Sequence, residues 1–112
     1  MTAHTFQGAS SRDYTYLMLP WSQLQGIPRQ AANYILAAGT PLSPEPVWIS
    51  EAHRLYAFFE ANPRLWDIAQ AKHSARLFYI RAEPGQAARL AEREDLIRSY
   101  LPPMDDRVPP ER

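Results

Sequence analysis

The chain has 112 residues, which is enough for one hydrophobic core but leaves no room for a second domain. Twelve basic side chains balance twelve acidic ones, which excludes an overall positive field that would hold a polyanion. There is no cysteine, and no apolar run approaches the roughly 18 residues of a membrane span, so we expect a soluble, cytoplasmic protein with no membrane partner. Residues 1–13 and 105–112 are expected to lie loosely at the surface.

Four strands are predicted from apolar and aromatic runs that end at turn residues. The first is Tyr14 to Leu19, which stops at a proline, and the second is Asn33 to Ala38, which stops at a glycine. Between them, Trp21 to Gln30 contains glycine and proline, and we expect a turn with a short helical segment. Val47 to Ile49 is a short, largely buried strand, and Leu77 to Ile80 is the fourth.

Three helices are predicted in the second half of the chain. Ser50 is a suitable N-cap for the first, and Asn62 followed by Pro63 starts the second. Residues 86–100 form the longest helix, which two prolines end. The order β-β-β-α-α-β-α predicts one α+β domain in which helices pack against an antiparallel sheet.

Six short pieces of sequence follow one another in a characteristic order. They are Phe6 to Ser10, Tyr14 to Trp21, Asn33 to Ile35, Pro46 to Ser50, Arg89 to Ile97, and Pro102 to Asp106. In this order they resemble the GIY-YIG nuclease family, over roughly residues 6–106. The resemblance implies a small antiparallel sheet flanked by helices, with residues 1–112 as a single domain.

The resemblance also implies metal-dependent cleavage of phosphodiester bonds in nucleic acid. In that scheme a Tyr relays the proton of the attacking water, and an Arg balances the charge that builds on the phosphate. A Glu on the last helix holds a divalent cation such as Mg²⁺ or Mn²⁺, which acts as a Lewis acid.

Carried over position by position, most of these residues have changed. Tyr34 matches the first Tyr of the family, and the alternative, which a single sequence favours, is a strand aromatic that packs on a helix. Trp48 stands at the second Tyr and has no hydroxyl, and Phe58 stands at the Arg and cannot balance a negative charge. Arg93 stands at the Glu and offers no lone pair to a cation, and Asp105 stands at the Asn.

The last helix carries two carboxylates that flank Arg93. On a helical wheel Glu94 falls near the middle of the apolar side, where an unpaired charge would be costly. It is predicted either to pair with Arg98, four residues on, or to serve as a relocated metal ligand. The expected inward face consists of Ala87, Leu90, Ala91, Ile97 and Leu101.

Other basic residues are candidates for phosphate contacts. Arg54 precedes Phe58 by one helical turn, so it either reaches the same pocket or is solvated. Lys72, Arg76 and Arg81 lie close together in sequence and could form a basic strip, with Arg93 as a further candidate. In a neutral chain this strip predicts weak nucleic-acid binding at best.

Two hypotheses follow from the sequence. The first is a GIY-YIG-like domain that has lost nuclease activity, needs no cofactor, and binds a protein partner or, weakly, nucleic acid, as an inhibitor or adaptor. The second is a functional endonuclease that uses Tyr34, Arg54 for phosphate, and Glu92 or Glu94 as the ligand of Mg²⁺ or Mn²⁺.

Overall fold

The part of the chain that the structure describes folds into a five-stranded antiparallel sheet with three helices, which confirms the predicted α+β class. This computed structural model describes residues 3–19 and 30–104, and for Tyr56, Phe58 and Phe59 it describes the backbone alone. The strands follow the spatial order β1-β2-β5-β3-β4. The elements are β1 (Ala3–Gln7), β2 (Asp13–Leu19), β3 (Ala32–Thr40), β4 (Ser43–Ala52), α1 (Leu55–Ala61), α2 (Pro63–His73), β5 (Leu77–Ala82) and α3 (Gln86–Tyr100).

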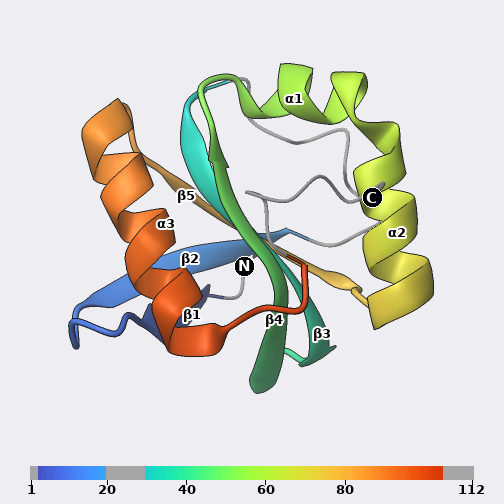
Figure 1. The fold of residues 1–112 in the computed structure, drawn as a ribbon, viewed down its shortest axis with the longest axis horizontal. Coiled ribbons are helices and arrows are strands. Elements are labelled where there is room, and N and C mark those ends of the chain that lie inside the picture. The colour runs from blue at the N-terminus through green and yellow to red at the C-terminus, as the bar shows by residue number, and fades with distance from the viewer. Residues whose placement is uncertain (1–2, 20–29, 105–112) are drawn as a thin grey trace.

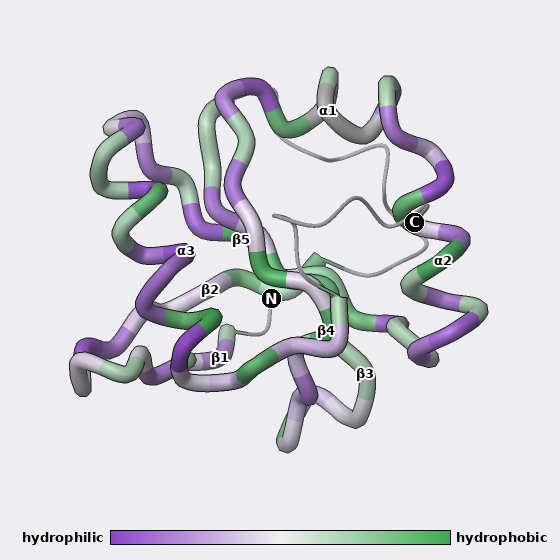
Figure 2. Tube along the Cα trace, in the orientation of Figure 1, coloured by the Kyte–Doolittle hydropathy of each residue, from purple (hydrophilic) through white to green (hydrophobic). Residues whose placement is uncertain are grey.

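The sheet has a helix layer on each side. Helix α3 packs against one face, and α1 and α2 cover the other (Figure 1). Side chains alternate along a strand, so in β3 Tyr34 and Leu36 face α1 and α2, whereas Ile35 faces α3. Figure 2 shows hydrophilic and hydrophobic segments alternating along α2 and α3, as expected of helices with one buried side.

Strand β3 is buried on both faces because helices lie on both sides of it. All seven residues from Ala32 to Ala38 are buried, and β3 pairs with both β4 and β5. Burying each large apolar side chain stabilises the fold by about 1.5–3 kcal/mol. This strand is therefore the centre of the structure and the element that separates the two cores.

Strand β1 was not predicted, and the expectation that residues 1–13 lie loosely at the surface is wrong for its residues. Phe6 is fully buried, and its ring makes edge contacts with Tyr16 at 5.5 Å and Tyr79 at 5.1 Å between centroids. The observed order is therefore β-β-β-β-α-α-β-α, one strand longer than predicted.

Strand β4 extends further than predicted in both directions. Pro44 and Pro46 lie within it, which an edge strand tolerates because one side needs no backbone donor. Ser50 is also within β4, paired with Tyr34, so the prediction that it caps a helix is wrong. After α3 the chain returns to this edge, where the Met104 N–H donates to the Val47 carbonyl over 3.0 Å.

The starts and ends of α2 and α3 agree with the sequence signals, but the orientation of α3 does not. Helix α2 begins at Pro63 after Asn62, and α3 ends at Tyr100, followed by Leu101 in a left-handed conformation with φ of 48°. The residues that α3 buries are Arg89, Glu92, Leu96 and Ile97. Of the predicted inward face, Ala87, Ala91 and Leu101 are exposed, and Leu90 is partly exposed.

Two earlier expectations concern other parts of the chain. The predicted turn at Trp21 to Gln30 lies almost wholly outside the described residues, as do residues 105–112. Among the helices that the structure describes, none is long and apolar enough to cross a membrane.

Candidate functional site

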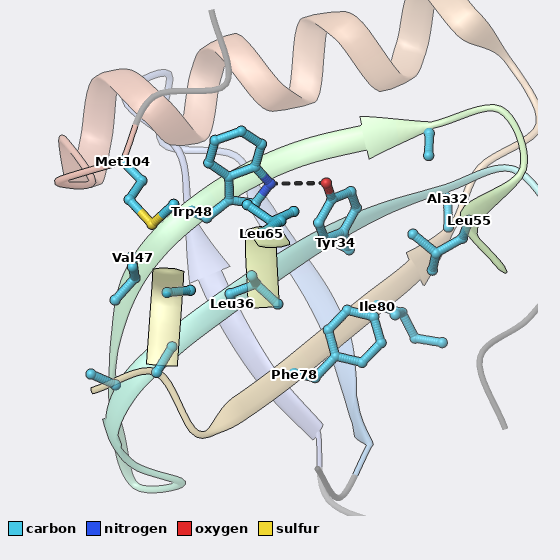
Figure 3. Packing of buried hydrophobic residues seen from close by; sticks show 14 residues of the cluster. Ala32, Tyr34, Leu36, Val47, Trp48, Leu55, Leu65, Phe78, Ile80 and Met104 are labelled. Atoms are coloured by element: carbon cyan, nitrogen blue, oxygen red, sulfur yellow. Dashed lines mark hydrogen bonds between the residues drawn. The ribbon is translucent and has the colours of Figure 1, made fainter. Parts of the chain in front are cut away.

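Tyr34 and Trp48 lie side by side in the core beneath α1 and α2. Tyr34 is fully buried and Trp48 is 4% exposed. The indole Nε1 of Trp48 donates a hydrogen bond to the Tyr34 hydroxyl over 2.9 Å, with Leu36 and Leu65 nearby (Figure 3). The Tyr34 ring is 6.2 Å from that of Phe78. The Tyr34 hydroxyl is therefore closed off from solvent and accepts a hydrogen bond from a core residue.

The remaining positions taken from the resemblance are only partly described. Phe58 belongs to α1, but its side chain is not described, and Asp105 lies outside the described residues. Arg54 is exposed just before α1. In the sheet register, Ser50 lies opposite Tyr34.

A partly buried ion pair lies on the other face of the sheet, beneath α3. Glu92 is 4% exposed; its Oε2 accepts a hydrogen bond from the Tyr16 hydroxyl, and its Oε1 accepts one from Arg81 Nη1 over 2.5 Å. Burial raises the pKa of Glu92, against the opposing effects of Tyr16 and Arg81. Burial and the Glu92 charge raise the pKa of Tyr16 well above its ordinary value.

The two candidate metal ligands are arranged as partners of arginines. Both oxygens of Glu92 accept hydrogen bonds from Tyr16 and Arg81, so a divalent cation would have to displace a donor and would be repelled by the guanidinium. Glu94 pairs with Arg93 at 3.3 Å and not with Arg98 as predicted. These residues do not fit a Mg²⁺ or Mn²⁺ site. Within the described ranges, no group of three or more His, Asp or Glu side chains is placed to hold a metal.

A second partly buried ion pair fixes the start of α3. Arg89 is 1% exposed, and its Nε donates to Glu51 over 3.0 Å. Its Nη1 donates to the carbonyls of Glu83 and Pro84, each over 2.9 Å. The Asn33 side chain donates to the Arg89 carbonyl over 2.9 Å. Helix α3 is therefore attached to β3 and β4 through polar groups as well as through its apolar residues.

The turn at residues 8–12 is fastened to α3 through Asp95. Its carboxylate accepts hydrogen bonds from Ser10 N at 2.8 Å, Ser10 Oγ at 2.6 Å and the Tyr14 hydroxyl at 2.8 Å. The hydrogen bond from Ser10 Oγ is the largest of the effects that lower the pKa of Asp95. Burial, and after it the hydrogen bond to the Asp95 carboxylate, raises the pKa of Tyr14 to about 12. A Cβ on Gly8 would lie 2.0 Å from Asp95 Oδ2, so the turn requires glycine there.

A cavity of about 140 Å³, open to solvent, lies between this turn, β5 and α3. The Arg81 guanidinium carbon lies 5.8 Å from the centre of the Tyr14 ring, a distance suited to a cation–π contact. We call the cavity the α3 pocket and take it as the candidate functional site. It is lined by Arg12, Tyr14, Arg81, Glu83, Ala88, Ala91 and Glu92.

The residues predicted to form a basic strip do not share one surface. Lys72 is exposed in the last turn of α2, and Arg76 is exposed just before β5. Arg81 lies five residues further along β5, about 16 Å away at about 3.3 Å per residue, and reaches toward α3. Arg93 is engaged by Glu94. A continuous track for a phosphate backbone is not formed by these side chains.

No family model matches this chain, and neither a curated protein nor a solved structure matches it. The resemblance to the GIY-YIG nuclease family stays a prediction. The choice of the α3 pocket as the candidate site is based on its geometry.

Sequence patterns do not single out most of the residues that line the α3 pocket. Tyr14 and Tyr16, two apart in a predicted strand, do indicate that both side chains face the same side of the sheet. Arg12 and Glu83 give no such signal, because each reaches the pocket from a connection whose course no local pattern encodes.

Proposed function

We propose that this chain is a binding domain without catalytic turnover, a degenerate relative of the GIY-YIG nucleases that acts on a protein partner as an inhibitor or adaptor. The observation that carries the proposal is the burial of the Tyr34 hydroxyl, which accepts the Trp48 hydrogen bond inside the core. A general base must lie within hydrogen-bond reach of the water that it activates. An enclosed hydroxyl that already has a partner suits packing better than proton transfer.

The carboxylates of α3 support the same proposal. Glu92 is the partner of Tyr16 and Arg81, and Glu94 is a partner of Arg93. Glu92 lies beneath α3, whereas Tyr34 faces α1 and α2 across the sheet. The alternative needs a hydroxyl and a metal-binding carboxylate at one phosphate, and these two side chains face opposite ways.

A protein partner suits the charges better than a nucleic acid does. The formal net charge is zero, and the basic residues that would contact phosphates are separated or paired. Affinity for nucleic acid rests mainly on several phosphate contacts made together. The proposal includes the cytoplasmic location expected from the sequence.

Cleavage is tested by incubating the purified chain with supercoiled plasmid and Mg²⁺ or Mn²⁺. We expect no more nicking than with the variants Tyr34→Phe and Glu94→Ala. Metal-dependent nicking that disappears in both variants would overturn the proposal and favour the endonuclease alternative.

Binding of nucleic acid is tested separately with a fluorescent DNA duplex over a series of salt concentrations. We expect no saturable binding even at low salt. Tight binding that falls steeply with salt would show several phosphate contacts and would contradict a protein partner.

A further inference from the structure

The α3 pocket contains the exposed guanidinium of Arg12. Arg12 lines the pocket and is exposed, and within the described residues its side chain makes no hydrogen bond or ion pair. The acidic groups beside it are already engaged: Glu92 by Arg81, and Glu83 by the backbone N–H of Gly85 at 2.9 Å. Among the described residues that line the pocket, Arg12 therefore keeps its guanidinium N–H donors for a ligand, while its charge also helps to lower the pKa of Asp95.

Arg81 supplies further donors to the same space. A guanidinium has five N–H donors, and Glu92 takes one at Nη1, from which Glu83 lies 3.9 Å away. The ion pair and the Tyr14 ring at 5.8 Å hold the guanidinium plane in place. Two arginines thus flank a single cavity: Arg81 is held by an ion pair, and the Arg12 side chain makes no hydrogen bond within the described residues.

We propose that the α3 pocket binds a carboxylate side chain, Asp or Glu, from an acidic segment of the protein partner. This inference rests on the proposed function and specifies how the partner is recognised. Guanidinium and carboxylate groups are matched in shape and charge and form two parallel hydrogen bonds. The small side chains of Ala88 and Ala91 leave an apolar wall for the methylene groups of the ligand.

The size of the pocket favours a single side chain over a nucleic-acid strand. Its volume of about 140 Å³ is close to that of a cavity of ~150 Å³ that admits benzene. One small acidic group fits such a space. A nucleic acid needs a groove that follows the backbone over several nucleotides.

The inference is tested by titrating the ¹⁵N-labelled chain with an end-blocked hexaglutamate peptide and recording NMR spectra. We expect saturable shifts at the amides of Ala88 and Ala91 and at the Nε of Arg12 and Arg81. An end-blocked hexaglutamine peptide, which has the same length and no charge, should cause none. Absence of a saturable shift with hexaglutamate would overturn the assignment.

Three variants distinguish the pocket from general charge attraction. Arg12→Gln should weaken peptide binding about tenfold, because it removes a charge-assisted pair. Ala91→Leu should weaken it by a similar factor by filling the pocket, and since Ala91 is exposed on a helix, leucine leaves the fold intact. Arg98→Gln removes the same charge from an exposed position outside the pocket lining and should change binding less than about twofold.

The remaining outcomes are equally decisive. If Arg98→Gln weakens binding as much as Arg12→Gln does, or if inorganic phosphate or a short DNA duplex shifts the same signals at lower concentration, the carboxylate assignment is wrong. If the peptide fails to bind and the plasmid stays uncut, the non-catalytic proposal stands and the pocket assignment alone falls. Plasmid nicking lost in Tyr34→Phe would instead remove the proposed function itself.

Discussion

Glu92 and Arg89 are charged side chains that the fold buries almost completely, at 4% and 1% exposure. Each is tolerated because its partners come from other elements: Tyr16 and Arg81 for Glu92, and Glu51 for Arg89. Removing one partner of such a pair typically costs about 3–5 kcal/mol, because the other charge is left buried and unpaired. These residues hold α3 in position and thereby shape the pocket.

Asp95 should make stability depend on pH in the acidic range. Its pKa is lowered in the folded state, so the charged form stabilises the fold above its ordinary pKa of 3.8, and this contribution is lost as pH falls through the lower folded value. We expect Asp95→Asn to lose about 1–2 kcal/mol at pH 7 in urea denaturation, and progressively less below pH 4. Asp67→Asn, an exposed change on α2, serves as the control. A loss of equal size at pH 7 and pH 3 would contradict this account.

The hydroxyl of Tyr34 should matter for stability. Tyr34→Phe leaves the Trp48 N–H buried without this acceptor, so we expect a loss of about 1–2 kcal/mol in the free energy of unfolding. The double variant with Trp48→Phe should lose less than the sum of the two single changes, because they share one hydrogen bond. A Tyr34→Phe variant as stable as the parent chain would show that the bond contributes nothing.

At the scale of elements, the turn before β2 depends on the close approach of its backbone to α3. The Asp95 carboxylate occupies the space that a Cβ on Gly8 would need, and Ser10 donates hydrogen bonds to the same carboxylate. Each named residue of the Phe-x-Gly-x-Ser segment thus has a structural role in this chain. Phe6 packs in the core, Gly8 allows the backbone to approach Asp95, and Ser10 donates hydrogen bonds to Asp95 on α3.

Gly8→Ala should therefore destabilise the domain, by about 2 kcal/mol. The new Cβ would lie 2.0 Å from Asp95 Oδ2 and would push the turn away from α3. Gly85→Ala is the matched control, because its Cβ would meet the end of the Glu83 side chain at 3.3 Å and has room to adjust. Thermal unfolding of the two variants compares them, and equal stability would contradict the predicted clash.

Most elements could be predicted from the sequence because their signals are local. Asn62-Pro63 marks the start of α2, and the aromatic and apolar runs mark β2, β3 and β5. Strand β1 was not predicted because Phe6 is its single large apolar residue, and one such residue cannot show the alternation of apolar and polar side chains that marks a strand. The orientation of α3 was mispredicted because its inward face includes Arg89 and Glu92, whose partners are far away in the sequence.

At the scale of the whole molecule, the sheet divides two different environments. The side facing α1 and α2 is largely apolar, with Tyr34 and Trp48 in its core. The side facing α3 adds partly buried ion pairs to a second apolar core and opens into the α3 pocket. Which face a side chain occupies depends on strand register and helix phase together, so the candidate site could not be located from motif order alone.

The separation of Tyr34 from Glu92 by the sheet is measured most directly by NOESY on the ¹³C-labelled chain. We expect NOEs from the Tyr34 ring to Trp48 and Phe78, and from the Glu92 side chain to the Tyr16 ring. NOEs from the Tyr34 ring to the Glu92 side chain would place both at one site and would contradict the account.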